Sequence, residues 1–198
     1  MNRRAVLAAP LLLAGCASLL PKQKYIPRVS WPLDPQPPQI QPTNETGKVL
    51  LLRDLAAAPG METQAIQTLN ADGSLTLSYY NQWAAVPARA ATGVLRSWLT
   101  ASGAFRAVVS PGSRLNPDLI VEGELTALMS DPARGRAVAV MTLLVIQDTH
   151  GDTRPLAQRR ITGTAPLSGS GYAAQVAAQT AALANAMDRA VAFISGFA

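Results

Sequence analysis

The sequence has very few of the residues on which metal sites, disulfides and most catalytic triads depend. Its 198 residues include one cysteine and one histidine, and only 15% of them are charged. A single cysteine excludes an intramolecular disulfide, and a single histidine excludes a metal site that needs two histidines from one chain. No Gly-x-Gly-x-x-Gly and no Gly-Lys-Ser/Thr motif occurs, so nothing in the sequence supports nucleotide binding.

Long apolar runs and blocks of like charge are also missing. The apolar run over residues 5–13 is far shorter than the roughly 20 residues that a membrane-spanning helix needs. The formal net charge of +5 is spread along the chain, so nucleic acid is not an expected partner. Any attachment to a membrane is therefore expected to come from something other than a hydrophobic span.

The N-terminus has the pattern of a secreted, lipid-modified protein. Arg3 and Arg4 precede the short apolar run, and the tetrapeptide LAGC, which ends at Cys16, follows it. A basic start, an apolar stretch and small residues before the cut are typical of a secretory signal peptide. The tetrapeptide resembles the bacterial lipobox, so we predict a lipoprotein signal peptide over residues 1–15 and a lipidation site at Cys16. The alternative is an ordinary signal peptide with an incidental cysteine.

Lipidation would determine both the cofactors and the location of the protein. Covalent diacylglycerol and an N-acyl lipid on Cys16 are the only non-protein groups that we expect; no cofactor and no metal is predicted. Several acyl chains hold a protein on a membrane far more firmly than one. Ala17 and Ser18 follow the cysteine, and the absence of aspartate there favours the outer membrane, with the protein facing the periplasm. Arg3 and Arg4 also leave export by the twin-arginine route open.

Residues 16–46, which start at the lipidated cysteine, are predicted to form a proline-rich tether. Seven of the 22 residues from position 21 to position 42 are proline. Such a composition favours an extended polyproline-II spacer at about 3.1 Å per residue, which would hold the domain several nanometres from the membrane. Tyr25, Ile26, Trp31 and Leu33 interrupt this segment. They either pack back onto the domain as a first edge segment or contact a partner.

One folded domain is predicted over residues 47–198. Apolar runs and period-2 alternation indicate strands, and apolar residues at three- and four-residue spacing indicate two helices. Residues 56–73 are expected to be a loop with a helical turn around 64–69. The run 137–146 is apolar at nearly every position, as in a central strand covered on both faces. The strands are placed at 48–55, 75–80, 105–109, 119–128, 137–146 and 154–164, and the helices at 84–101 and 172–195.

This order of elements predicts an α/β fold: a single three-layer α/β/α sandwich. We expect a mixed sheet of about five strands and two main helices, which follow the proline-rich tether.

No residue set suitable for catalysis emerges. His150 lies between acidic residues in a predicted turn, and the segment 168–171 lacks the first glycine of Gly-x-Ser-x-Gly. Ser170 is instead expected to be a helix N-cap. Glu122 and Glu124 share one strand face, but such a pair is more often a solvated face than a catalytic one. The protein is therefore not expected to be an enzyme.

Two groups of side chains are candidates for contact with a partner. Arginines gather near the ends of the predicted hairpins, where they either face an acidic partner or lipid phosphate, or remain solvated and discourage edge pairing. Aromatic residues gather at the end of the second strand, as an interface anchor or as part of the core. The arginines are Arg134, Arg136, Arg154, Arg159 and Arg160, and the aromatic residues are Tyr79, Tyr80 and Trp83.

The lipobox and the tether, together with three stretches of the domain, resemble the ABC-type transport auxiliary lipoproteins, the PqiC-like group. The stretches are VLLLRDLAAAPGMETQAIQTL, LTLSYYNQWAAVPARAATGVLRSWLTASGAFRAVV and LIVEGELTAL. As in that family, a strand ends near a Trp-Ala pair, here Trp83 and Ala84, and a helix with leucines at Leu95 and Leu99 leads to a short strand. The similarity covers about residues 16–195. The chain departs from the family in the segment before residue 47, which lacks a Tyr-rich strand.

The resemblance implies a function in transport. It implies a non-enzymatic outer-membrane lipoprotein subunit of an MCE-type ABC lipid transport system, which docks the periplasm-spanning MCE assembly at the membrane. The implied partners are the MCE-domain transport subunit, the membrane through the lipid anchor, and further copies of the chain in a homo-oligomer. The alternative function is an envelope structural or assembly lipoprotein that scaffolds a secretion or outer-membrane complex.

Overall fold

A computed structural model describes residues 25–149 and 152–198. Within these two ranges, nine strands form one mixed sheet, so the predicted α/β class is confirmed but the expected number of about five strands is too low. The two main helices lie close to their predicted positions. The strands are β1 Val29–Trp31, β2 Val49–Leu52, β3 Ala56–Ala57, β4 Ala65–Leu69, β5 Leu75–Trp83, β6 Ala107–Val109, β7 Leu119–Asp131, β8 Arg136–Thr149 and β9 Asp152–Pro166, and the helices are α2 Pro87–Ala101, α3 Gly171–Ser195 and the 3-10 turn η2 Pro132–Arg134.

Strand β7 organises the sheet. One of its edges pairs antiparallel with β8, which in turn pairs with β9. The other edge pairs in succession with β2, β3 and β4, all of them parallel to β7. Beyond these, β6 pairs with β2, β5 pairs with β4, and β1 pairs with β5. The sheet therefore forks: β2 and β6 extend it at one end of β7, and β4, β5 and β1 extend it at the other.

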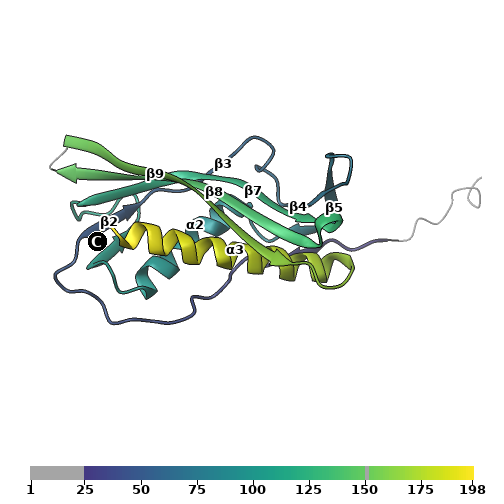
Figure 1. Ribbon diagram of the computed structural model, residues 1–198, viewed down its shortest axis with the longest axis horizontal. Coiled ribbons are helices and arrows are strands. Elements are labelled where there is room, and N and C mark those ends of the chain that lie inside the picture. Colours follow the sequence, from purple (N-terminus) through teal and green to yellow (C-terminus); the bar gives the residue numbers. More distant parts are fainter. Residues whose placement is uncertain (1–24, 150–151) are drawn as a thin grey trace, which may run out of the picture.

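Both helices lie on the same face of this sheet, so the fold has two layers and the predicted third layer is wrong (Figure 1). Helices α2 and α3 contact each other and share one hydrophobic core with the sheet. Strand β8 is interior, as predicted, but helices cover only one of its faces, and the partly buried Val138, Leu144 and Ile146 lie on the other. The fully buried face carries Ala137, Ala139, Met141, Leu143 and Val145.

Small residues bring helix α3 close to the sheet. Four alanines at four-residue spacing are buried along it: Ala178, Ala182, Ala186 and Ala190. They face β9 at Gly163, where a Cβ atom would lie only 2.1 Å from the carbonyl oxygen of Ala182. Larger buried side chains, including Leu183 and Met187, fill the space beside this contact. The alanine-rich composition therefore sets the distance between the two layers, in addition to favouring the helix itself.

Residues 29–46, which were predicted as part of the tether, are packed on the domain. Strand β1 pairs with β5, and the side chain of Leu33 is buried in the core. The indole Nε1 of Trp98 donates a buried hydrogen bond of 2.8 Å to the carbonyl oxygen of Pro35. The backbone N–H of Asn44 then donates to the carbonyl of Gly103. Gly103 has a φ of 66°, and the backbone of Pro42 lies so close that a side chain at position 103 would not fit. Of the two alternatives for Trp31 and Leu33, packing back onto the domain is confirmed.

The segment predicted as a loop with a helical turn contains strands β3 and β4 instead. Ile66 in β4 is fully buried in the core. Strand β4 lies between β5 and β7, so its backbone hydrogen bonds go to strands on both sides. This long-range pairing, and not local propensity, gives the segment its structure.

Candidate interaction surfaces

The described residues hold no cluster of acidic, His or Cys side chains that could form a metal centre. No group of three or more His, Cys, Asp or Glu residues comes together within them. Glu122 is paired with Arg53, with 2.9 Å between Oε2 and Nη1, as a structural ion pair. Ser170 occupies the N-cap position of α3 without a side-chain capping hydrogen bond. Cys16 and His150 lie outside the described residues.

The aromatic candidates divide between the surface and the core. Tyr79 and Tyr80 are exposed on β5, with their ring centroids 5.1 Å apart in an edge-to-face arrangement. The guanidinium of Arg28 lies 4.2 Å from the centroid of the Tyr79 ring. Trp83 is 1% exposed and belongs to the core, so it does not contribute to an interface in this structure.

Along β5, the face that carries Leu77 points away from the helices. Thr68 of β4 faces α3, since its Oγ1 donates to Oε1 of Gln175. Gln67 therefore points away from the helices, and Leu77, which pairs with it, does the same. Ser78 is buried, whereas apolar side chains along β5 are exposed. Together with those just before and within β1, they form a set of exposed side chains along the β5–β1 edge of the sheet. The set spans both faces of that edge, because β1 pairs with β5 so that Val29 shares the face of Trp83. We call it the tether-end surface: Tyr25, Ile26, Val29, Leu75, Leu77, Tyr79 and Tyr80.

A buried polar contact fixes the strands beneath this surface. The Nε2 of Gln179, a fully buried residue of α3, donates to the carbonyl oxygen of Gln67 at 3.0 Å and to the Oγ of Ser130 at 2.9 Å. Gln67 donates in turn to the carbonyl of Gly60 at 2.8 Å. The contact joins β4, β7 and α3, so the end of the sheet that carries β5 is held in a defined position.

Arg134 and Arg136 lie at this same end of the sheet, the first in the turn after β7 and the second at the start of β8. Both approach the carboxylate of the buried Asp131, at 3.0 Å and 3.8 Å. The hydrogen bond from Arg134 holds the pKa of Asp131 below its usual range despite the burial of the carboxyl. The side chains of Arg134 and Arg136 remain 64% and 46% exposed. They therefore stabilise the turn and still face solvent.

Arg159 and Arg160 lie elsewhere, in a groove between the edge strand β9 and helix α3. The groove encloses about 380 Å³, and Arg189 and Phe193 of α3 also line it. The guanidinium of Arg159 lies 4.6 Å from the centroid of the Phe193 ring, and Nη1 of Arg189 donates to the carbonyl of Thr162 at 2.6 Å. We call this set the β9 arginine groove. No sequence pattern indicates that Arg189 belongs to this set, because only the packing of α3 on β9 brings it there.

The fifth predicted arginine is separate from both groups. Arg154 is exposed near the start of β9, and its Nη2 donates to Oε1 of Gln147 at 3.4 Å. The predicted set of five arginines thus occupies three places instead of two hairpin ends.

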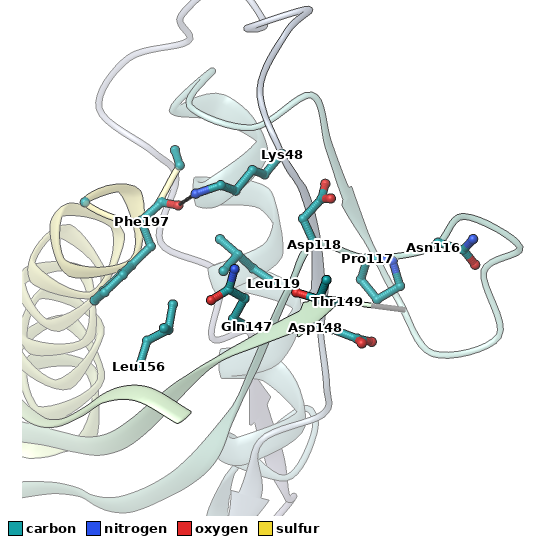
Figure 2. Close-up of a pocket in the computed structure, with 12 residues that line it drawn as sticks. Lys48, Asn116, Pro117, Asp118, Leu119, Gln147, Asp148, Thr149, Leu156 and Phe197 are labelled. Atoms are coloured by element: carbon teal, nitrogen blue, oxygen red, sulfur yellow. Dashed lines mark hydrogen bonds between the residues drawn. The ribbon is translucent and has the colours of Figure 1, made fainter. Parts of the chain in front are cut away.

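An open cleft of about 740 Å³ lies at the opposite end of the molecule from the tether-end surface. Figure 2 shows Lys48 reaching across it to the carbonyl oxygen of Phe197, with 2.5 Å between Nζ and the oxygen. The carboxylate of Asp118 accepts a hydrogen bond of 2.8 Å from the backbone of Val49. These contacts fasten the C-terminal residues and β2 to the rest of the domain, so they have a structural role.

The fold and its surfaces together define a class of protein. A sheet covered by helices on one face carries exposed apolar and basic side chains, and the described residues contain no group of His, Cys, Asp or Glu that could hold a metal ion. No helix in the described part of the chain is both long and apolar enough to cross a bilayer. The exposed apolar and basic side chains are therefore the candidate contact surfaces of this α/β domain.

The comparison with protein families gives this class a name. Residues 31–191 match the family of the ABC-type transport auxiliary lipoprotein component, and the chain belongs to that family. The match begins in β1 and ends in α3, so it spans nearly the whole packed domain. None of the curated proteins with which the chain was compared matches its sequence.

Solved structures of low sequence identity share the fold. Protein XCC0632 from Xanthomonas campestris is 21% identical, with a TM-score of 0.69 over 85% of this chain and 97% of that one. An uncharacterized protein is 15% identical, with a TM-score of 0.61 over 81% and 99% of the two chains. The hypothetical protein CT253 from Chlamydia trachomatis is 11% identical, with a TM-score of 0.55 over 77% and 98%.

Proposed function

We propose that this chain is a non-enzymatic outer-membrane lipoprotein subunit of an MCE-type ABC lipid transport system. In this proposal, Cys16 carries the diacylglycerol and N-acyl lipid, and the domain faces the periplasm and docks the MCE assembly at the membrane. The observation that carries the proposal is the family match over residues 31–191, since the family is an auxiliary component of ABC-type transport. The lipobox-like tetrapeptide before Cys16 supports the anchored part of it.

The β9 arginine groove is the surface that we assign to the MCE-domain partner. Three guanidinium groups, from Arg159, Arg160 and Arg189, border it beside the ring of Phe193. Arginine and aromatic side chains are enriched at protein–protein interfaces, and guanidinium groups bind carboxylates in a bidentate manner. In the described residues β9 pairs only with β8, and the side chains of Arg159 and Arg160 are exposed. An acidic surface is the partner chemistry that this groove fits.

A cross-linking pull-down tests the assignment. The double variant Arg159→Glu/Arg160→Glu should lose most of the MCE subunit that the wild-type protein recovers from cross-linked cells, because charge reversal replaces attraction by repulsion. The matched control is Arg106→Glu/Arg114→Glu, which makes the same change of charge at exposed residues outside the groove. Circular dichroism should show that both variants fold.

Two results would count against the proposal. Equal recovery from both double variants would show that the groove is not the docking surface. Failure of the wild-type protein to recover any MCE subunit, with recovery of secretion or outer-membrane assembly components instead, would favour the alternative of an envelope scaffold. A homo-oligomer would appear in the same experiment as cross-linked multimers of this chain.

A further inference from the structure

Exposed large apolar side chains are unusually concentrated at one end of the molecule. In the described part of the chain ten such side chains are exposed, and seven of them make up the tether-end surface. The other three are Ile40, Leu115 and Tyr172, which lie apart from β1 and β5 in the sequence. Single exposed apolar side chains are common on folded proteins, but a group of this size indicates contact with a membrane or another protein.

The group lies where the described chain begins. Strand β1 runs parallel to β5, with Val29 opposite Asn81, and the exposed Tyr25 and Ile26 come just before it in the chain. Figure 1 shows this start of the chain at the same end of the molecule as β4 and β5, whereas the C-terminus lies at the opposite end.

The length of the chain before Tyr25 limits how far this surface can be from a lipid anchor. Tyr25 follows Cys16 by only nine positions, which a fully extended chain spans in at most about 30 Å. The intervening stretch contains Lys22 and Lys24 and no acidic residue. Basic residues close to a bilayer are attracted to anionic lipid headgroups. This step rests on the lipidation of Cys16 in the proposed function.

The chemistry of the surface also fits a lipid interface. Tyrosine rings concentrate at the headgroup level of membranes, where one side of the ring is apolar and the hydroxyl is hydrated. Tyr79 and Tyr80 are 61% and 41% exposed, and Leu75 and Leu77 stand beside them on the same strand at 47% and 51%. Arg28, which stacks on Tyr79, supplies a cation whose long side chain can reach a phosphate.

From these observations we propose that the tether-end surface inserts into the interface of the membrane that carries the lipid anchor. The acyl chains on Cys16 provide the attachment, and the seven exposed side chains orient the domain. The opposite end, with the open cleft, then points away from the bilayer.

Site-specific fluorescence in proteoliposomes tests this inference. Acylation of Cys16 consumes the only thiol in the chain, so an introduced cysteine is the single site for a thiol-reactive nitrobenzoxadiazole label. Leu77→Cys places the label on the tether-end surface. Leu115→Cys is the matched control, because Leu115 is 53% exposed, close to the 51% of Leu77, and lies in the loop before β7. The vesicles contain phosphatidylethanolamine and phosphatidylglycerol, with or without brominated acyl chains.

We expect the label at position 77 to be quenched by brominated lipid and to be at least about threefold less accessible to iodide than the label at position 115. Equal iodide accessibility at the two positions would overturn the inference. Protection from iodide without quenching by brominated lipid would also overturn it, because a second protein copy would then cover the surface.

Flotation separates this inference from the proposed function. If neither the wild-type protein nor Cys16→Ser floats with the vesicles, both the anchor and the inference fail. If the protein floats but the label at position 77 is unprotected, only the inference fails.

Discussion

Gly163 offers the sharpest test of how helix α3 packs on the sheet. A Cβ at this position would lie 2.1 Å from the carbonyl oxygen of Ala182 and 2.3 Å from the backbone nitrogen of Ala186, whereas ordinary contacts begin at 3.4 Å. Gly163→Ala therefore requires α3 to move by more than 1 Å. The atoms in the way belong to the backbone of α3, which cannot rotate aside as a side chain can. Overpacking of this kind typically costs about 1–3 kcal/mol in the free energy of unfolding. For a domain of this size the melting temperature should fall by about 2–12 °C.

The measurement is urea unfolding followed by tryptophan fluorescence, with calorimetry for the melting temperature. Gly93→Ala is the control, because Gly93 is exposed in α2 and a Cβ there meets no atom within 4 Å. It should stabilise the protein by about 0.5–1 kcal/mol through helix propensity. A Gly163→Ala variant as stable as the wild-type protein would refute the close packing of α3 on β9 and the role assigned to the alanine stripe.

Two further predictions concern the N-terminal segment and the turn after β7. Trp98→Phe removes the donor to the carbonyl of Pro35 and should lower the free energy of unfolding in urea by about 1–3 kcal/mol. It should also speed proteolysis within residues 36–46. Unchanged cleavage would contradict the docking of this segment. Asp131→Asn should lower the free energy of unfolding at pH 7. The pKa of the wild-type Asp131 carboxyl is depressed in the folded state, so its carboxylate stabilises the folded protein at any pH above the pKa that Asp131 has in the unfolded chain. The difference between Asp131→Asn and wild type should shrink as the pH falls below about 4, and a constant difference in the urea midpoint would argue against the ion pair.

The helices and the three long strands could be predicted because each has a local pattern. The prediction for α3 began at residue 172, and the helix begins at Gly171. Strands β7, β8 and β9 likewise include the predicted runs. Strands β1, β3 and β4 could not be predicted in this way, because they are short and are held by pairing with strands far away in the sequence. The third layer was expected because a continuous apolar run suggests cover on both faces, which the structure does not provide.

The surfaces show the limits of sequence patterns more clearly. The period-2 pattern of the strand at 75–80 places Leu75 and Leu77 on one face, but it does not say which face the helices cover. That is decided by the register of β4 against β5 and by the contact of Thr68 with α3. Similarly, a charge pattern grouped Arg159 with Arg160, but only tertiary packing adds Arg189 to them.

The position of β7 has a consequence for the order in which the chain can fold. Strands β2, β3 and β4 precede β7 by tens of residues, and each depends on it for a neighbour in the sheet. Until β7 has been synthesised through residue 131, β4 has β5 on one side and no strand on the other. Non-local pairing of this kind slows folding, since loop closure comes before the contacts that stabilise it. A polypeptide with this topology therefore stays unfolded for longer than one whose strands pair only with their neighbours in the sequence.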